Sequence, residues 1–137
     1  MIVQTQTTSF KSEVYQAVHN LLTDTIKIAL YTANASLDAD TTVYTTANEV
    51  VASGYTAGGE VMTGVTLNTS GYTVYVNWAN VSWSTSVTAR CALIYNASQG
   101  NKSIAVLDFG SDKTSTGTFT ITMPANTATS ALIRSSN

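Results

Sequence analysis

The stretch that decides the fold is Val87-Thr88-Ala89-Arg90-Cys91-Ala92-Leu93-Ile94-Tyr95. Side chains of an extended chain point to opposite sides in turn. One face of this stretch would therefore carry Val87, Ala89, Cys91, Leu93 and Tyr95. A period of two in β-branched, apolar and aromatic residues is typical of a strand. We therefore predict a strand here, in a mainly β protein.

The same rhythm continues on both sides of this stretch. Ile26, Ile28 and Leu30 alternate after Asp24-Thr25, and other single faces are formed by Tyr72, Val74, Val76 and Trp78, by Ile104 and Val106, and by Phe119, Ile121 and Met123. Turns are expected near 68–71, 96–101 and 110–117. Six or seven short strands of this kind predict one antiparallel β-sandwich or jelly-roll domain over 1–137, with 61–137 as its body.

A different period precedes the first strand. Apolar residues recur at helical spacing in Phe10, Val14, Ala17, Val18, Leu21 and Leu22. Thr8 and Ser9 are candidate caps, because a hydroxyl can accept a hydrogen bond from a free N–H of the first turn. The spacing predicts one N-terminal helix over 9–22 with a single apolar stripe.

Residues 33–60 have no clean period and end in Ser53-Gly54-Tyr55-Thr56-Ala57-Gly58-Gly59. Long irregular segments in a compact domain usually make functional contacts. We therefore interpret 33–60 as an irregular contact arm.

Charge and composition exclude several classes of function. The chain has 24 threonines and 15 serines but only 14 charged residues, with a net charge of −2. It lacks the basic stripe that a phosphate backbone requires, so we expect no nucleic-acid partner. It also has no apolar run of about 20 residues, so we expect no membrane span. Met1–Phe10 lacks a secretory signal pattern and Cys91 is a lone thiol, so we expect folding in a cytoplasm.

Few residues offer chemistry. His19 has no second histidine to share a metal, Asp38 and Asp40 are too few ligands for a calcium loop, and the chain lacks the nucleophile elbow, the P-loop and the dinucleotide fingerprint. Asp108, Asp112 and Lys113 are expected to pair across a surface turn. We therefore predict no enzyme, no metal site and no cofactor.

Several segments together resemble a family of small virion structural proteins of tailed bacteriophages. They are Ser9-Phe10-Lys11, His19, Asp24 to Thr32, Asn48-Glu49-Val50, Gly54 to Gly59, Thr88-Ala89-Arg90, Leu93 to Asn96 and Ala105 to Lys113. The resemblance covers nearly the whole chain, and it departs from the family at Val18, where a glycine or another small residue is usual. It implies a component that folds in the bacterial host and is assembled on a virion.

The leading hypothesis is a capsid decoration, or cement, protein. Its partners would be the major capsid protein and copies of itself, as a symmetric oligomer, with a trimer expected. The expected contact residues are Tyr44, Glu49, Tyr55 and Glu60, because tyrosine is a common interface anchor.

Two alternatives stay open. One is a tail, baseplate, collar or fibre-associated subunit that contacts other tail proteins. The other is a glycan-binding β-sandwich used in host attachment, with Trp83 and Tyr75 stacking on sugars.

Overall fold

Ten strands, one α-helix and one short 3-10 helix make up the computed structural model, which describes residues 2–136. Their bounds are β1 Val3–Gln6, α1 Thr8–Val14, β2 Ile26–Tyr31, β3 Glu60–Val61, β4 Thr66–Ser70, β5 Thr73–Asn77, β6 Val81–Trp83, β7 Thr88–Asn96, η1 Ala97–Gln99, β8 Lys102–Thr114, β9 Phe119–Ile121 and β10 Ile133–Ser135. Strands and isolated bridges account for 41% of the described residues, so the mainly β prediction is confirmed.

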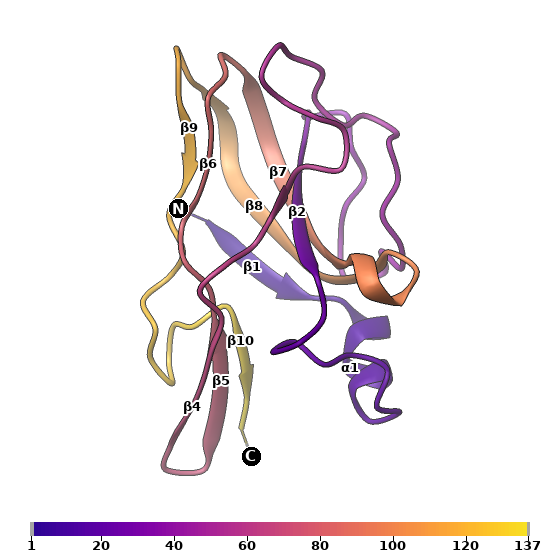
Figure 1. Cartoon of the computed structure of the whole chain (residues 1–137), viewed down its shortest axis with the longest axis vertical. Helices are drawn as coiled ribbons and strands as arrows, with labels where there is room; N and C mark the ends of the chain where they lie inside the picture. The colour runs from indigo at the N-terminus through magenta and orange to yellow at the C-terminus, as the bar shows by residue number, and fades with distance from the viewer. Residues whose placement is uncertain (1, 137) are drawn as a thin grey trace.

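Three antiparallel sheets organise these strands (Figure 1). The largest has the order β1-β8-β7-β2-β3, the second β10-β5-β4, and the third pairs β6 with β9. The strand predicted over 87–95 is β7, which leaves out Val87 and lies between β2 and β8. Its Ile94 lies opposite Ile28 on one side and opposite Ala105 on the other.

The main hydrophobic core draws residues from all three sheets. Ile28 of β2, Trp83 of β6 and Phe119 of β9 belong to the same buried cluster, together with Val76 of β5 and Ile133 of β10. The core therefore lies between the largest sheet and the two smaller ones and holds them together.

The largest sheet is also covered on its other face. Ala29 and Tyr31 of β2 form a second buried cluster with Leu93 of β7, against which Leu37 and Tyr44 pack. Leu37 and Tyr44 belong to 33–60, so this segment lies on the sheet as a cover layer. It forms isolated bridges from Glu49 to Tyr31 and from Val43 to Lys102.

The helix prediction over 9–22 is wrong beyond its first half, since α1 ends at Val14. The Val18 N–H bonds the Glu13 carbonyl (3.1 Å) and the Ala17 N–H bonds the Val14 carbonyl (3.2 Å), with Ala17 in the left-handed region at φ 59°. This pair of bonds is a Schellman stop. Phe10 is buried, whereas Val14 remains 44% exposed, so most of the stripe has no sheet to cover it.

Two local predictions at the N-terminus also change. The cap of α1 is Thr7, whose hydroxyl accepts from the Phe10 N–H (3.3 Å), and neither Thr8 nor Ser9 fills that place. Strand β1 was not predicted, because Val-Gln-Thr-Gln has no alternation of apolar and polar residues. It nevertheless pairs with β8 from Val3 to Gln6. Strands β1 and β2 thus belong to the body of the fold although they precede residue 61.

The turn predicted over 110–117 begins later, because β8 continues to Thr114. A register shift between Ala89 and Cys91 of β7 lets the ladder continue past the irregularity. Tyr72 is 90% exposed in the β4–β5 loop and does not share the core with Trp78. Within residues 2–136, no helix has the length and apolarity needed to cross a membrane.

Candidate functional site

The Glu49 carboxylate is the centre of the arm's polar contacts. A turn with Asn48 at φ 63° leads the chain alongside β2, where the Val50 N–H bonds the Leu30 carbonyl (3.0 Å). This places the Glu49 side chain against the sheet with only 8% of the residue exposed. Buried carboxylates are costly unless hydrogen bonds satisfy them.

Three donors satisfy this carboxylate. The Tyr44 hydroxyl donates to Oε1 (2.7 Å), and the Tyr55 hydroxyl (2.5 Å) and the Gly58 N–H (2.8 Å) donate to Oε2. Among residues 2–136, no basic side chain lies within ion-pair distance of Glu49. The negative charge is therefore held by hydroxyl and amide dipoles.

Burial also raises the pKa of the tyrosine hydroxyls around Glu49. It is the largest cause of the raised pKa of Tyr55 and Tyr44, followed for both by their hydrogen bonds to Glu49. Burial, and next the Glu49 charge, raise the pKa of Tyr31 and raise that of Tyr95 to about 12. The phenols therefore stay protonated near neutral pH and act as donors.

Further bonds tie the arm to the sheet. The Tyr95 hydroxyl of β7 donates to the Gly58 carbonyl (2.6 Å), and the Tyr31 hydroxyl of β2 donates to the Thr45 carbonyl (2.6 Å). The rings of Tyr44 and Tyr95 stack with centroids 4.6 Å apart. The arm is thus attached to the sheet both before Glu49, at Thr45, and after it, at Gly58.

The structure brings together three of the four residues expected to contact a partner. Tyr44 and Tyr55 both donate to Glu49, whereas Glu60 lies apart and exposed on β3. Tyr31, Tyr95 and Gly58 also belong to this network, although no sequence pattern indicates them. The residues next to a tyrosine in a strand do not indicate which distant loop its hydroxyl will bond.

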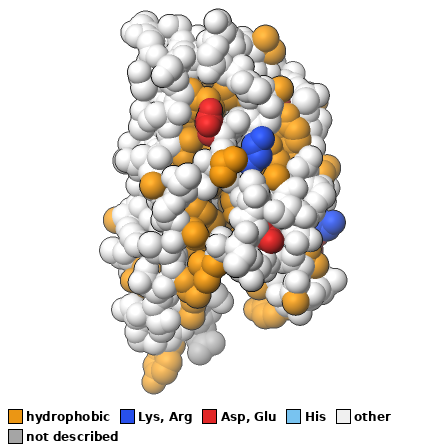
Figure 2. Space-filling view, in the orientation of Figure 1, with side chains coloured by type: hydrophobic (Ala, Val, Ile, Leu, Met, Phe, Trp, Pro, Cys, Tyr) orange, Lys and Arg blue, Asp and Glu red, His pale blue; other side chains and the backbone are white. Residues whose placement is uncertain are grey.

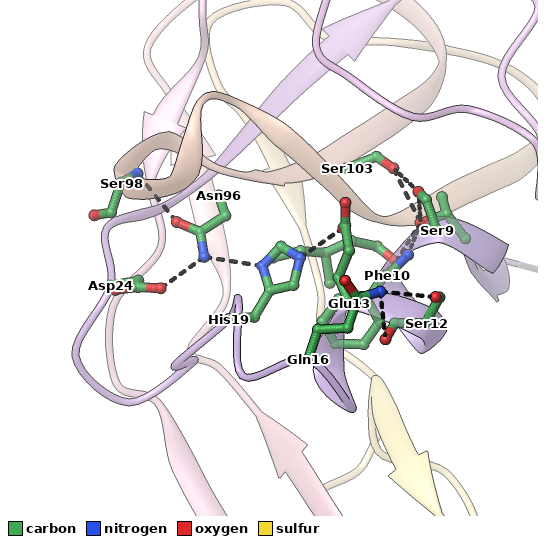
Figure 3. Close-up of polar contacts among 12 residues, drawn as sticks. Ser9, Phe10, Ser12, Glu13, Gln16, His19, Asp24, Asn96, Ser98 and Ser103 are labelled. Carbon is green, nitrogen blue, oxygen red and sulfur yellow. Dashed lines mark hydrogen bonds and ion pairs between the residues drawn. The ribbon is translucent and has the colours of Figure 1, made fainter.

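A second polar network surrounds His19 (Figure 3). The imidazole, whose side chain is 0% exposed, lies between Glu13 of α1 and Asn96 at the end of β7. Its Nε2 is 2.9 Å from Glu13 Oε1, and its Nδ1 is 3.0 Å from Asn96 Nδ2. The His19 ring also packs on Phe10, with centroids 5.0 Å apart.

Asn96 determines the donor and acceptor roles at this histidine. Its Oδ1 accepts from the Ser98 N–H (3.0 Å) and its Nδ2 donates to Asp24 Oδ2 (2.8 Å), so the amide group presents N–H to His19. His19 Nδ1 must then accept, and Nε2–H donates to Glu13. Both ring nitrogens are occupied, so the network joins α1 to the end of β7 and leaves no free nitrogen for a substrate.

The remaining candidate groups lie apart from one another. The Asp40 N–H bonds the Asp38 carboxylate (2.8 Å) in an exposed turn. Asp108 accepts from the Gly110 N–H (2.8 Å), which is the main cause of its lowered pKa, and its side-chain partner is Arg90, not Lys113. Within the described part of the chain, no three His, Cys, Asp or Glu side chains are placed to hold a metal ion.

Cys91, the lone thiol of the sequence, is buried as a free cysteine. Burial, followed by the Asp108 charge, raises the pKa of its thiol to about 11. Such a thiol is a poor nucleophile at neutral pH.

The aromatic residues considered for sugar stacking differ in exposure. Trp83 is 2% exposed in the core, with its ring near those of Tyr55 and Phe119, at centroid distances of 6.1 and 6.2 Å. Its indole N–H has no hydrogen-bond partner among residues 2–136. Tyr75 is half-buried on β5. Trp83 therefore presents no open ring face to a ligand.

Comparisons with known proteins add no relative. No protein-family model, no curated protein and no solved structure matches this chain. The polar clusters around Glu49 and His19 are saturated by their own neighbours, and both join segments that are distant in sequence. Their geometry supports a structural role: the Glu49 cluster holds the 33–60 arm on the sheet, and the His19 cluster holds α1 there.

Proposed function

We propose that this chain is a structural component of a tailed-bacteriophage particle, most specifically a decoration protein that binds the major capsid protein lattice. The proposal starts from the sequence resemblance to small virion structural proteins. It includes self-association on the lattice, where a trimer is the expected form. It also describes the layered sheets as a β-sandwich or jelly roll.

The observation that carries the proposal is the separation of charge. Residues 61–89 and 114–133 contain no Asp, Glu, Lys, Arg or His. They supply β4, β5, β6 and β9 entirely. On the face in Figure 2, the side formed by these strands is white and orange, and the charged side chains lie farther across the molecule. An uncharged, hydroxyl-rich surface fits contact with other protein, because burying it desolvates no ion.

The internal networks support the same role. The Glu49 carboxylate and the His19 ring form their hydrogen bonds with residues of the same chain and so stabilise the fold. A cement protein works by rigid contact at many equivalent positions, and its weak contacts add through multivalency. Of the four residues expected to contact a partner, Glu60 alone is exposed, and it lies next to the uncharged segment 61–89, not inside it.

The first test locates the chain in the particle by cryo-electron microscopy. The proposal expects density for this fold on the icosahedral shell, repeated with the capsid lattice. Density confined to the tail would contradict the decoration role and favour the tail-subunit alternative. Absence of the chain from purified particles would contradict a virion role altogether.

A second test uses matched charges. Thr118→Glu places a carboxylate on the exposed uncharged side, and Ser36→Glu places the same charge on an exposed loop of the charged side. Co-sedimentation with capsids that lack this chain should fall by about tenfold or more for Thr118→Glu, because one desolvated charge costs at least ~1.4 kcal/mol. Ser36→Glu should bind as the native protein does.

A further inference from the structure

The β4–β5 hairpin has an outer edge that the rest of the protein leaves unpaired. The second sheet has the order β10-β5-β4, so β4 is its edge strand. The Asn126 amide donates to the Thr66 hydroxyl (3.1 Å) at one end of β4. Beyond it, no backbone hydrogen bond reaches the outer edge of 67–70 from any of residues 2–136. Figure 1 shows the hairpin extending past the body at the end near the C-terminus.

The register identifies which groups face outward. A two-residue loop, Gly71-Tyr72, joins Ser70 to its partner Thr73. In such a hairpin the closing pair is hydrogen-bonded, and hydrogen-bonded pairs then alternate along the ladder. Asn68 therefore directs its backbone groups to Tyr75 of β5, whereas Leu67 and Thr69 direct theirs away from the sheet.

This edge carries none of the usual protection. Natural edge strands avoid pairing with other chains through charge, proline, a bulge or a cover. Strand β4 reads Thr-Leu-Asn-Thr-Ser, all five residues are exposed, and its register with β5 is continuous. The hairpin also exposes Leu67 (50%), Val74 (41%) and Tyr72 (90%).

We propose that β4 is a self-association edge, on which the β4 strand of a second copy pairs in antiparallel orientation. A two-fold axis at Asn68 places Leu67 of each copy opposite Thr69 of the other. The outward N–H and C=O groups of these two residues then exchange four hydrogen bonds. The two Asn68 side chains meet on the axis, where each amide has both a donor and an acceptor for the other.

Charge favours a second copy over a charged partner. An isologous contact places the same surface of two copies against each other, so a strand with a net charge would repel its copy. The uncharged segment 61–89 meets its copy without this penalty. This two-fold pairing is a different contact from the trimer proposed on the lattice, and it does not depend on the particle function.

The expected strength is low in free solution. Stable interfaces bury about 1,200–2,000 Å² in total, more than a five-residue edge supplies. We therefore expect dimers to form at concentrations on the order of 0.1–1 mM. Sedimentation velocity between about 10 µM and 1 mM measures this transition on the full chain.

Two variants and one control test the edge. Asn68→Asp places two carboxylates opposite each other on the axis, and Thr69→Pro removes an outward N–H that the internal ladder does not use. Each should weaken dimerisation by about tenfold or more. Thr116→Asp adds the same charge in the exposed turn between β8 and β9 and should leave dimerisation unchanged. Figure 1 shows this turn at the end of the molecule opposite the hairpin. Circular dichroism checks that each variant folds.

Hydrogen exchange by NMR gives a second readout that needs no variant. The Leu67 and Thr69 amides should become protected as the concentration rises. A native chain that stays monomeric to 1 mM with both amides unprotected would overturn the inference. So would association that Asn68→Asp and Thr69→Pro leave intact while both variants are folded, because another surface would then join the copies. Failure of the chain to bind capsids bears only on the particle function.

Discussion

The Tyr55 hydroxyl donates to the Glu49 carboxylate over 2.5 Å and at the same time accepts from the Leu30 N–H over 2.9 Å. One phenol therefore links the arm to the main chain of β2. Both of its bonds lie in the interior, where an unpaired polar group is expensive.

Tyr55→Phe should destabilise the protein by about 1.5–3 kcal/mol, because the substitution leaves the Leu30 N–H without its acceptor and removes one donor from a buried carboxylate. Urea unfolding measures the loss. Tyr15→Phe is the matched control, since Tyr15 is 88% exposed and should change stability by less than about 0.5 kcal/mol. Equal effects of the two variants would argue against the Tyr55 link.

Gly59→Ala should prevent stable folding, whereas Gly71→Ala should be tolerated. A Cβ on Gly59 would lie 1.8 Å from the Ile28 carbonyl oxygen, and the residue has φ 78°. Gly71 has φ 59° but nothing within 4 Å of its Cβ position, so its cost is the left-handed conformation alone, about 1–2 kcal/mol. Expression and thermal unfolding compare the two. A Gly59→Ala protein as stable as Gly71→Ala would show that the approach to β2 is looser than described.

Ala17→Gly should stabilise the protein. Ala17 lies in the Schellman stop that follows α1 and has φ 59°. Glycine adopts this conformation without the steric cost of a Cβ. The expected gain is about 0.5–1 kcal/mol, measured by denaturant unfolding. Ala35→Gly, in a turn without positive φ, should give no gain. A loss of stability in Ala17→Gly would mean that the Schellman stop is not the native end of this helix.

Alkaline pH should unfold the protein before the buried phenols ionise freely. Burial, with the Glu49 charge, raises the pKa of Tyr95 from 10.0 to about 12. A raised tyrosine pKa stabilises the folded state fully below pH 10, and that contribution is lost as pH rises from 10 to 12. Tyrosinate absorbance and near-UV circular dichroism should therefore change together in this window. Ionisation of all tyrosines with an unchanged near-UV spectrum would contradict the prediction.

Trp83→Phe should cost much less than Trp83→Ala. The Trp83 indole N–H has no partner among the described residues, so phenylalanine removes no hydrogen bond and keeps an aromatic ring in the core. We expect about 1–2 kcal/mol for phenylalanine and 3–5 kcal/mol for alanine, from thermal or denaturant unfolding. A cost for Trp83→Phe equal to that of alanine would indicate a buried partner of the indole, such as an ordered water.

Local patterns predicted the strands with strong alternation. In β7 and β2 each apolar residue reports its own face through the period of two, which requires no knowledge of the partner strand. The same reasoning failed for β1, whose polar residues are held by pairing with β8 alone. It also overextended α1, since helical spacing continues past Val14 where no sheet is available to cover the stripe.

The sequence by itself determined a mainly β chain, a lone cysteine and a region free of charge, because these follow from composition and short-range periodicity. Only the tertiary structure decided the partners of Glu49 and His19. Asn96 reaches His19 across 77 positions of the chain, and Tyr95 bonds Gly58, whose N–H donates to Glu49, across 37. A carboxylate that looks like a surface contact in sequence became an interior anchor because folding placed three donors around it. Long-range hydrogen bonds depend on which segments meet in space, and local sequence does not encode that.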